Sequence, residues 1–351
     1  MKNIVVIGTV GIPACYGGFE SLVENLTKNR SEGFNYTVFC SSPSYNTKLI
    51  SHNGANLIYL PLKANGIQSI FYDIYSLIKT LRLKPDTVLI LGVSGCVFLP
   101  VFRKLSKAKV VTNIDGLEWK RDKWNFLAKK FLKFSETLAV KYSDSIVSDN
   151  RAIAEHVKKC YSKVSSVIAY GGDHALRGDL VEDFIDGDYA LGLCRIEPEN
   201  NVDMILEAFS TNGRNIKFVG NWGSSDFGLQ LKEKFAKYKN IELIDPIYDL
   251  DVLYELRRKC ELYVHGHSAG GTNPSLVEMM HFSKTILAFD CDFNRFSTKN
   301  KAHYFSNSLE LQDVISSLTP QEKESNANYM KSIAQEEYTW GKISYSYESL
   351  Y

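Results

Sequence analysis

The sequence predicts an α/β fold with two doubly wound, parallel-sheet domains in tandem. Short runs of β-branched residues alternate with amphipathic segments of helical period along most of the chain. This alternation is typical of parallel sheets covered by helices. One polar, acidic stretch near residues 173–188 divides the alternation into two series, and 351 residues is the length of about two domains.

The first series of elements defines a domain over residues 1–170, which we expect to bind the acceptor. Strands are expected at 4–7, 36–40, 56–60, 87–91, 109–113, 144–147 and 164–169, with helices at 19–29, 67–81 and 125–142. Residues 171–187 are polar and weakly periodic, so we interpret them as a linker.

The second series defines a domain over residues 188–325, followed by helices at 326–351. Strands are expected at 189–193, 216–219, 241–244, 262–265 and 285–288, with helices at 201–209, 229–238, 250–258, 274–282 and 309–318. Folds of this kind bind ligands at the carboxyl ends of their strands, so each domain is expected to present a ligand site there.

The charge of the chain is divided between the two series. The formal net charge of +1 is too close to neutral for a dedicated nucleic-acid binder. Residues 1–170 nevertheless hold 23 Lys and Arg against 12 Asp and Glu, or +11, whereas residues 171–351 hold 18 against 28, or −10. The basic first half therefore favours an anionic partner for that domain.

Cysteine usage and the apolar stretches favour a cytoplasmic protein. The seven cysteines are scattered and form no Cys-x-x-Cys pair, which argues against a disulfide framework or a zinc cluster. The first apolar run breaks at Gly8 and Gly11, as in a strand that enters a Gly-rich loop rather than in a signal peptide. The most apolar stretch, residues 88–102, is too short to cross a bilayer.

A Gly-rich loop, residues 11–20, follows the first expected strand and contains Gly17 and Gly18. Glycines there would let backbone amides approach a phosphate at the start of the next helix. The spacing matches neither a dinucleotide fingerprint nor a P-loop. On local grounds the loop is either a phosphate site or only a tight turn.

Arg195 follows the first strand of the second series, with Pro198 and Asn200 just after it. A guanidinium at the carboxyl end of a strand suits recognition of a diphosphate. The alternative is a solvated Arg that pairs with Glu197 or Glu199.

Residues 264–280 carry the strongest local pattern. A strand ends in a Gly-Gly loop, Thr272 or Asn273 is positioned to cap a helix, Pro274 takes the first helical position, and Glu278 lies one turn further on. Free amides at that helix start suit phosphate or sugar oxygens, and a carboxylate one turn later can accept two ribose hydroxyls.

His265 and His267 in the same stretch could be metal ligands. No third ligand follows at zinc spacing, so we predict no metal site.

Asp115 and Glu118 follow a strand of the first series and are candidates for binding an acceptor hydroxyl. The alternative is that the loop aspartate caps the following helix.

Four motifs, in order and in register, give the chain a family resemblance. Residues 16–20, 115–119, 195–201 and 265–275 resemble those of glycosyltransferase family 4, and more narrowly its bacterial rhamnosyltransferase subgroup, which builds polysaccharide and O-antigen repeat units. The resemblance implies the GT-B fold, in which two Rossmann-like domains face a cleft. It also implies that the closing helices around residues 337–340 cross back to the first domain.

The resemblance also implies roles for single residues. Arg195 stands at the family's diphosphate-binding Arg, and Glu278 at its ribose-binding Glu. Asn200 replaces a family Lys, and Gly270 replaces a Glu that touches the donor sugar. The implied donor-binding set is Gly17, Gly18, Arg195, Asn200, Gly271, Thr272, Asn273, Ser275 and Glu278.

From this resemblance we expect transfer of a sugar, L-rhamnose from dTDP-rhamnose, to a lipid-pyrophosphate-linked saccharide, with retention of configuration and without metal or other cofactor. Asp115 and Glu118 are the expected catalytic residues. Transfer from another UDP- or GDP-sugar, a nucleotide-sugar epimerase or phosphorylase, and a non-catalytic sugar-nucleotide-binding subunit remain alternatives.

Residues 119–134 interleave lysines and one arginine with Trp and Phe. This pattern is typical of a helix that lies on an anionic membrane, so we expect peripheral association with the inner face of the bacterial plasma membrane. The alternative is an ordinary amphipathic helix with a solvated Lys face.

Overall fold

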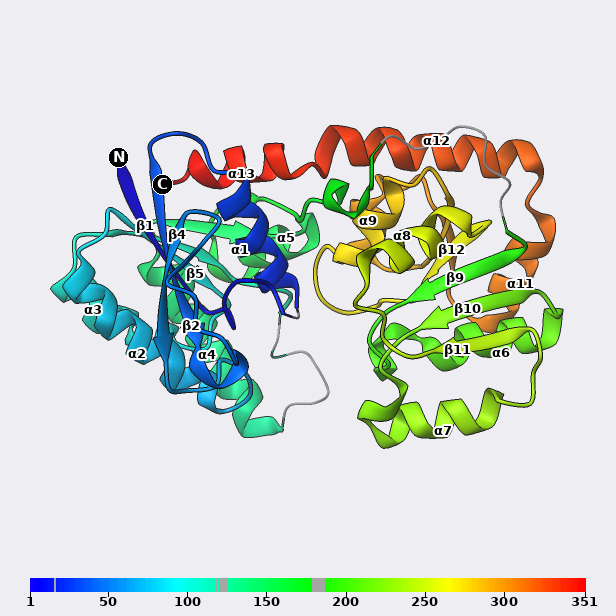
Figure 1. The fold of residues 1–351 in the computed structure, drawn as a ribbon, viewed down its shortest axis with the longest axis horizontal. Helices are drawn as coiled ribbons and strands as arrows, with labels where there is room; N and C mark the ends of the chain where they lie inside the picture. Colours follow the sequence, from blue (N-terminus) through cyan, green and yellow to red (C-terminus); the bar gives the residue numbers. More distant parts are fainter. Residues whose placement is uncertain (16, 118, 120–124, 179–186) are drawn as a thin grey trace. The chain divides into compact units, whose positions relative to one another are not determined.

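The computed structural model describes residues 1–15, 17–117, 119, 125–178 and 187–351. The chain divides into two compact units, one made of residues 1–169 and 340–351 and the other of residues 170–339. Each unit is an α/β domain with one sheet (Figure 1). Glu118 and most of the basic segment at 120–124 lie outside the described residues.

The first unit contains an eight-stranded sheet in the order β3-β4-β2-β1-β5-β6-β7-β8. All neighbouring strands are parallel except β3 and β4. The strands are β1 (Lys2–Ile7), β2 (Phe34–Ser41), β3 (Ser51–His52), β4 (Ala55–Leu60), β5 (Thr87–Leu91), β6 (Lys109–Asn113), β7 (Ser145–Ser148) and β8 (Ser166–Val167). The α-helices are α1 (Gly18–Lys28), α2 (Gln68–Leu83), α3 (Leu99–Leu105), α4 (Phe126–Tyr142), α5 (Arg151–Tyr161) and α13 (Trp340–Glu348), with 3-10 turns η1 (Ser42–Ser44) and η2 (Cys96–Phe98).

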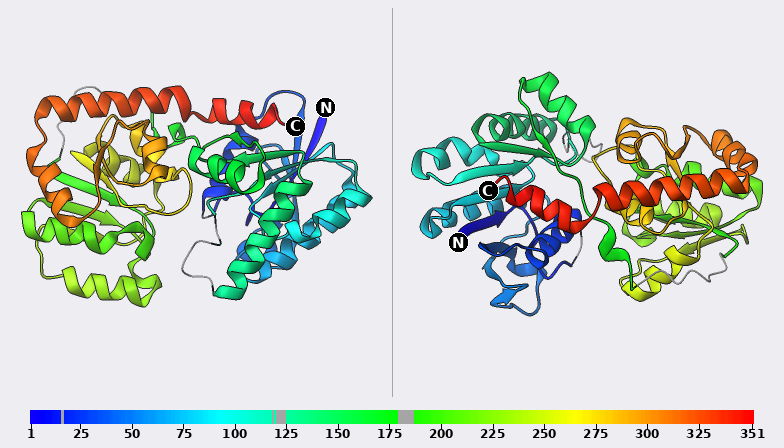
Figure 2. Two further views of the ribbon diagram at one scale, coloured as in Figure 1. Left: turned by 180° about the vertical axis from the view of Figure 1, so that it is seen from behind. Right: turned by 90° about the horizontal axis from the view of Figure 1, so that it is seen from above.

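Helices cover both faces of this sheet. α13, the last helix of the chain, packs beside α1, and α3 packs against both α2 and α4 (Figures 1 and 2). The Tyr347 side chain on α13 is fully buried, and its hydroxyl accepts a hydrogen bond from Asn113 Nδ2 at 2.8 Å. Because Asn113 is the last residue of β6, this bond fixes α13 at the carboxyl end of that strand.

The second unit contains a fully parallel six-stranded sheet in the order β11-β10-β9-β12-β13-β14. Its strands are β9 (Tyr189–Leu193), β10 (Asn215–Val219), β11 (Ile241–Ile244), β12 (Leu262–His265), β13 (Thr285–Phe289) and β14 (His303–Phe305). Its α-helices are α6 (Val202–Asn212), α7 (Asp226–Phe235), α8 (Leu250–Lys259), α9 (Pro274–Met280), α10 (Asp292–Ser297), α11 (Ser308–Ser317) and α12 (Pro320–Glu337), with 3-10 turns η4 (Asp173–Ala175), η5 (Pro198–Asn200) and η6 (Trp222–Ser224).

Helices also lie on both sides of this second sheet. α6 packs against α7 and α11 on one side, and α9 packs against α12 on the other (Figure 1). The core between the sheet and α6 is apolar and includes the fully buried Trp222, Phe209 and Phe218.

The direction of strand order reverses once in each unit, between β1 and β5 and between β9 and β12. Such a reversal opens a crevice at the carboxyl ends of the strands. The loops after β1, β9 and β12 carry three of the four sequence motifs, and the fourth follows β6.

The expected strands are all present, although the strand expected at 164–169 is reduced to two residues in β8. The stretch 88–102 is a strand, a turn and the start of a helix. Among the described residues no helix is both long and apolar enough to cross a bilayer.

Candidate functional site

In the second unit, hydrogen bonds join the loop after β9 to the loop after β12. The Asn200 Nδ2 atom donates to the main-chain oxygen of Arg195 at 2.7 Å, and Asn200 Oδ1 lies 2.8 Å from His267 Nδ1. Ser268 donates from both its amide and its hydroxyl to the Glu199 carbonyl, at 2.9 and 2.8 Å. The two loops are therefore held together at the switch point of the sheet.

The Arg195 carbonyl fixes the orientation of the Asn200 amide. A carbonyl oxygen can only accept, so the NH₂ end of the amide faces Arg195 and the oxygen faces His267. His267 must then carry its proton on Nδ1. Asn200 is 4% exposed, and its side chain braces the Arg195 loop from within. Its expected contact with the donor stays a prediction.

The two loops also meet at Gly266. A Cβ at this position would come within 2.1 Å of the Asn200 main-chain oxygen, and Asn201 Nδ2 donates to the Gly266 carbonyl at 2.8 Å. Only glycine therefore allows the loop after β12 to approach the loop after β9 this closely.

Arg195 lies two residues beyond the end of β9, and its side chain is 41% exposed. Its Nη1 atom is 3.5 Å from Glu197 Oε1, so the pairing weighed as the alternative does exist. Both side chains are partly solvated, and an exposed ion pair of this kind contributes little to stability. The guanidinium can therefore exchange Glu197 for a ligand anion at small cost.

At the start of α9 the capping residue agrees with the sequence prediction, but the backbone amides are not all free as predicted. Asn273 is the N-cap residue, Pro274 follows at the first helical position, and Glu278 lies one turn later. However, the Ser275 amide donates to Asn273 Oδ1 at 3.0 Å, so this amide is already used. The preceding Gly271 and Thr272 are buried.

Glu278 forms a cluster with two residues that the sequence did not indicate, the buried Arg257 and the half-buried His174. Its Oε2 atom pairs with Arg257 Nη2 from α8, and its Oε1 atom lies 3.4 Å from His174 Nε2 from η4. The Glu278 side chain is 13% exposed and that of Arg257 is 6% exposed. Burial lowers the pKa of His174, and the neighbouring Glu278 carboxylate opposes this effect.

The segment read as a linker packs on α9 over residues 172–175. The Gly172 amide donates to the Tyr338 carbonyl at 2.7 Å, and a Cβ on Gly172 would lie 2.6 Å from the Val277 carbonyl oxygen. The close approach of this backbone places His174 beside Glu278. A sequence of weak periodicity gave no signal for this contact.

Asp290 and Asp292 form an Asp-x-Asp pair directly after β13. Asp290 forms a bidentate ion pair with Arg295, with O–N distances of 2.5 and 2.6 Å. This pairing lowers the Asp290 pKa. Within the described residues, no group of three or more His, Cys, Asp and Glu side chains is arranged to hold a metal ion.

In the first unit, Glu20 closes the Gly-rich loop. Its Oε1 atom accepts from the Thr9 hydroxyl at 2.8 Å and from the Val10 amide at 2.7 Å. Gly17 has φ of 115°, and a Cβ there would meet Glu20 Oε2 at 2.2 Å, so glycine is required. Gly18 begins α1 directly after it. Burial raises the Glu20 pKa against the effect of these two hydrogen bonds.

Asp115 lies half-buried in the loop after β6, with a left-handed backbone of φ 59°. Its amide donates to Asn113 Oδ1 at 3.0 Å, and Asn113 also bonds Tyr347 on α13. The N-cap of α4 is Asn125, so Asp115 does not cap that helix. Trp119, later in the same loop, donates from Nε1 to Glu136 Oε2 at 2.9 Å.

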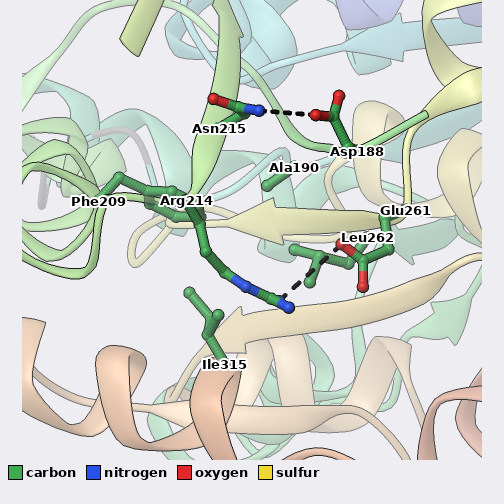
Figure 3. A pocket seen from close by; sticks show the side chains of 9 residues that line it. Asp188, Ala190, Phe209, Arg214, Asn215, Glu261, Leu262 and Ile315 are labelled. Atoms are coloured by element: carbon green, nitrogen blue, oxygen red, sulfur yellow. Dashed lines mark hydrogen bonds and ion pairs between the residues drawn. The ribbon is translucent and has the colours of Figure 1, made fainter. Parts of the chain in front are cut away.

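A separate pocket of about 240 Å³ lies at the amino ends of the second sheet (Figure 3). Arg214 and Glu261 face each other across it at 3.9 Å, and Asn215 donates to Asp188 at 3.0 Å. The predicted site residues do not line this pocket, which is at the opposite end of β9 from Arg195.

A family model matches the first part of the chain. Residues 1–173 match the family model described as "Domain of unknown function (DUF1972)". Among curated proteins no relative is found by sequence.

Solved structures match over the whole length. Sucrose-phosphate synthase from Thermosynechococcus elongatus superposes with a TM-score of 0.79 at 12% identity, covering 100% of this chain and 98% of that one. The fold is GT-B. HepE from Anabaena in complex with UDP-glucose superposes with a TM-score of 0.76 at 12% identity, over 100% and 99% of the two chains. A glycosyltransferase from Rickettsia africae gives 0.75 at 12% identity, over 99% and 97%. The GT-B fold expected from the motifs is thus confirmed, and at this identity the likeness shows the fold alone.

Proposed function

We propose that this GT-B protein is a glycosyltransferase that takes a sugar from a nucleoside diphosphate and attaches it to an acceptor hydroxyl. The observation that carries the proposal is the partly exposed Arg195 at the carboxyl end of β9, on a loop that Asn200 and His267 brace from within. A GT-B neighbour, HepE, has been solved with UDP and with UDP-glucose, which supports a nucleotide-sugar as the ligand class.

Arg195 is assigned to the donor diphosphate. When the bond from the sugar to the phosphate breaks, negative charge grows on the departing diphosphate, and a fixed guanidinium stabilises that charge. The brace through Asn200 holds the main chain of Arg195, so the cation needs little reorganisation as the charge develops.

Glu278 is assigned to the ribose, with Gly271, Thr272, Asn273 and Ser275 lining the same end of the sheet. Its Oε2 atom is committed to Arg257, whereas the contact of Oε1 with His174 is long, at 3.4 Å. Oε1 is therefore the atom that we assign to a ribose hydroxyl. Arg257 holds the carboxylate in the orientation that this bond needs.

Transfer requires neither a covalent intermediate nor a metal in this scheme. The acceptor oxygen forms the new bond to the anomeric carbon on the face from which the diphosphate leaves, and its proton passes to a phosphate oxygen of the leaving group. Asp115 and Glu118 are proposed to orient the acceptor hydroxyl. The side chain of Asn113 holds the backbone amide of Asp115 in place. Gly17 and Gly18 would face the donor phosphates or the acceptor.

The resemblance to family 4 and its rhamnosyltransferase subgroup supports dTDP-rhamnose as donor. Gly270, with φ of 130°, stands where the wider family has a sugar-contacting Glu. A site without that carboxylate suits a deoxysugar, which has one hydroxyl fewer to bind. The proposed acceptor is a lipid-pyrophosphate-linked saccharide of bacterial surface polysaccharide.

The first unit supports a membrane-bound acceptor, reached from the cytoplasmic side. On α4, Phe126, Leu127 and Phe134 are exposed, and Lys130 Nζ lies 4.4 Å from the centre of the Phe126 ring. Lys129 and Lys133 share this helix, whose exposed aromatic and cationic groups suit an anionic lipid surface.

A thermal-shift panel of dTDP-, UDP- and GDP-sugars tests the donor, because a ligand bound only by the folded state raises the melting temperature. We expect the largest shift with dTDP-rhamnose. Release of free nucleotide that requires an acceptor would separate a transferase from an epimerase or a binding subunit.

A further inference from the structure

We infer that Cys160 is a reactive thiol, with His156 as its proton acceptor and Glu136 as the group that orients His156. These residues lie in the first unit, on α5 and α4. Cys160 is exposed, and its Sγ atom lies 3.6 Å from His156 Nδ1. His156 Nε2 in turn lies 3.1 Å from Glu136 Oε1, so thiol, imidazole and carboxylate form one connected row.

The Glu136 carboxylate decides which His156 nitrogen carries the proton. Its side chain is 1% exposed, and its oxygens accept from Tyr161 at 2.6 Å and from Trp119 at 2.9 Å. A carboxylate only accepts hydrogen bonds, so His156 donates to it from Nε2. The lone pair of Nδ1 therefore faces the Cys160 thiol.

This arrangement supplies the parts of an activated nucleophile. The Cys160 proton passes to His156 Nδ1, and the resulting imidazolium remains bonded to the buried Glu136 carboxylate. Cys160 is near the carboxyl end of α5, where the helix dipole opposes a thiolate, but Lys158 and Lys159 in the same turn offset that field.

The co-reactant class is a low-molecular-weight disulfide. The Cys160 thiolate attacks one sulfur of the disulfide, a new S–S bond forms as the old one breaks, and the other half leaves as a thiolate that takes up the proton held by His156. The product is a mixed disulfide on Cys160 and one free thiol. An alkyl halide such as iodoacetamide probes the same thiolate irreversibly.

The chain contains a matched control in Cys15, which is also exposed. Its Sγ atom lies 4.0 Å from the Tyr45 hydroxyl, where Cys160 has an imidazole. Buried cysteines behave differently, since burial raises the pKa of the Cys40 thiol to about 11. The comparison between Cys160 and Cys15 therefore isolates the effect of His156 from that of exposure.

The test is alkylation of the native full-length chain with excess iodoacetamide at pH 7, with the rate at each cysteine followed by peptide mass spectrometry. We expect Cys160 to react roughly tenfold faster than Cys15. In His156→Gln the Cys160 rate should fall to that of Cys15, while the Cys15 rate in the same sample stays constant and reports an intact fold. In concentrated urea the two wild-type rates should converge, and this arm does not depend on whether the variant folds.

A second arm replaces iodoacetamide with oxidised glutathione, and the expected product is a mixed disulfide at Cys160 ahead of Cys15. Equal rates at the two cysteines in the native protein would overturn the inference. So would a His156→Gln variant that keeps the wild-type ratio.

Discussion

The Asn200 side-chain oxygen lies 2.8 Å from His267 Nδ1, and both side chains are buried where the loops after β9 and β12 meet. Through its amide nitrogen Asn200 also holds the Arg195 carbonyl. Asn200 is uncharged, and through this bond it positions the neighbouring Arg195.

Replacing Asn200 with Ala should destabilise the second unit and reduce sugar transfer. The change removes the hydrogen bonds of Asn200 to the Arg195 carbonyl and to the His267 ring, each of which contributes about 0.5–1.5 kcal/mol. Chemical denaturation and steady-state kinetics measure the two effects. Asn215→Ala is the control, because Asn215 is at the other end of the sheet and makes an exposed bond to Asp188. Equal behaviour of the two variants would contradict the bracing role.

Arg195→Ala should reduce kcat/KM by roughly 10- to 150-fold, corresponding to about 1.5–3 kcal/mol of lost transition-state stabilisation. Arg214→Ala is a matched control. Arg214 is 43% exposed and pairs with Glu261, much as Arg195 is 41% exposed and pairs with Glu197. The control variant should keep wild-type kinetics with the same nucleotide-sugar. If both variants lose activity equally, the assignment of Arg195 to the diphosphate fails.

Tyr347→Phe should lower turnover more than donor affinity. The tyrosine hydroxyl accepts from Asn113, which also holds the Asp115 amide, so its loss loosens the residue that we assign to the acceptor hydroxyl. Kinetics with the acceptor varied at saturating donor measure this effect. Asp115→Ala should show the stronger form of the same defect, and wild-type turnover in that variant would remove Asp115 from the scheme.

Asp73 makes the stability of the first unit depend on pH. Burial raises its pKa to about 8, against hydrogen bonds from Ser94 and the Gly95 backbone. The folded state therefore keeps a proton that the unfolded chain releases above about pH 4, so the free energy of unfolding falls as pH rises from about 4 to 8. The proton is bound in both states below that range and lost from both above it.

Asp73→Asn removes this titration and should become more stable relative to the wild type as pH rises. The difference is expected to reach a few kcal/mol near pH 8. Urea unfolding of both proteins at pH 5 and pH 8 measures it. Parallel pH dependence of the two proteins would show that Asp73 is ionised in the fold.

Replacing Lys129, Lys130 and Lys133 with Gln should weaken binding to anionic vesicles, each lysine contributing about 1 kcal/mol near the surface at low salt. Wild-type binding in a flotation assay should fade as salt rises. The same substitution at Lys232, Lys234 and Lys237 in the second unit serves as the control. If neither added salt nor the substitution of Lys129, Lys130 and Lys133 reduces vesicle binding, this result would argue against α4 as the membrane contact.

The strands and the order of the motifs could be predicted from the sequence, because β-branched runs and Gly-rich loops are local signals. For the same reason the sequence predicted a cap at Thr272 or Asn273 and the Pro274 start of α9, and Asn273 is the cap in the structure. The roles that depended on partners from distant segments could not be predicted. Arg257 reaches Glu278 from another helix, and His174 reaches it from a segment whose weak periodicity indicated only a linker.

The bracing role of Asn200 shows the same limit. Its residue type and spacing fit a site residue, but its direction is set by the Arg195 carbonyl and the His267 ring, which come together only after the sheet has formed. The environment of Glu136 could not be predicted for the same reason. Three side chains donate hydrogen bonds to its carboxylate, Trp119 from the loop after β6 and His156 and Tyr161 from α5.

The measurement that tests the central claim most directly is calorimetric titration of dTDP-rhamnose, UDP-glucose and GDP-mannose into the wild type, Arg195→Ala and Arg214→Ala. The account predicts that the wild type and Arg214→Ala bind at least one of these nucleotide-sugars with equal affinity, dTDP-rhamnose most tightly, and that Arg195→Ala binds it at least tenfold more weakly. Equal affinity in all three proteins, or no binding to any, would contradict the claim that Arg195 holds the diphosphate of a sugar donor.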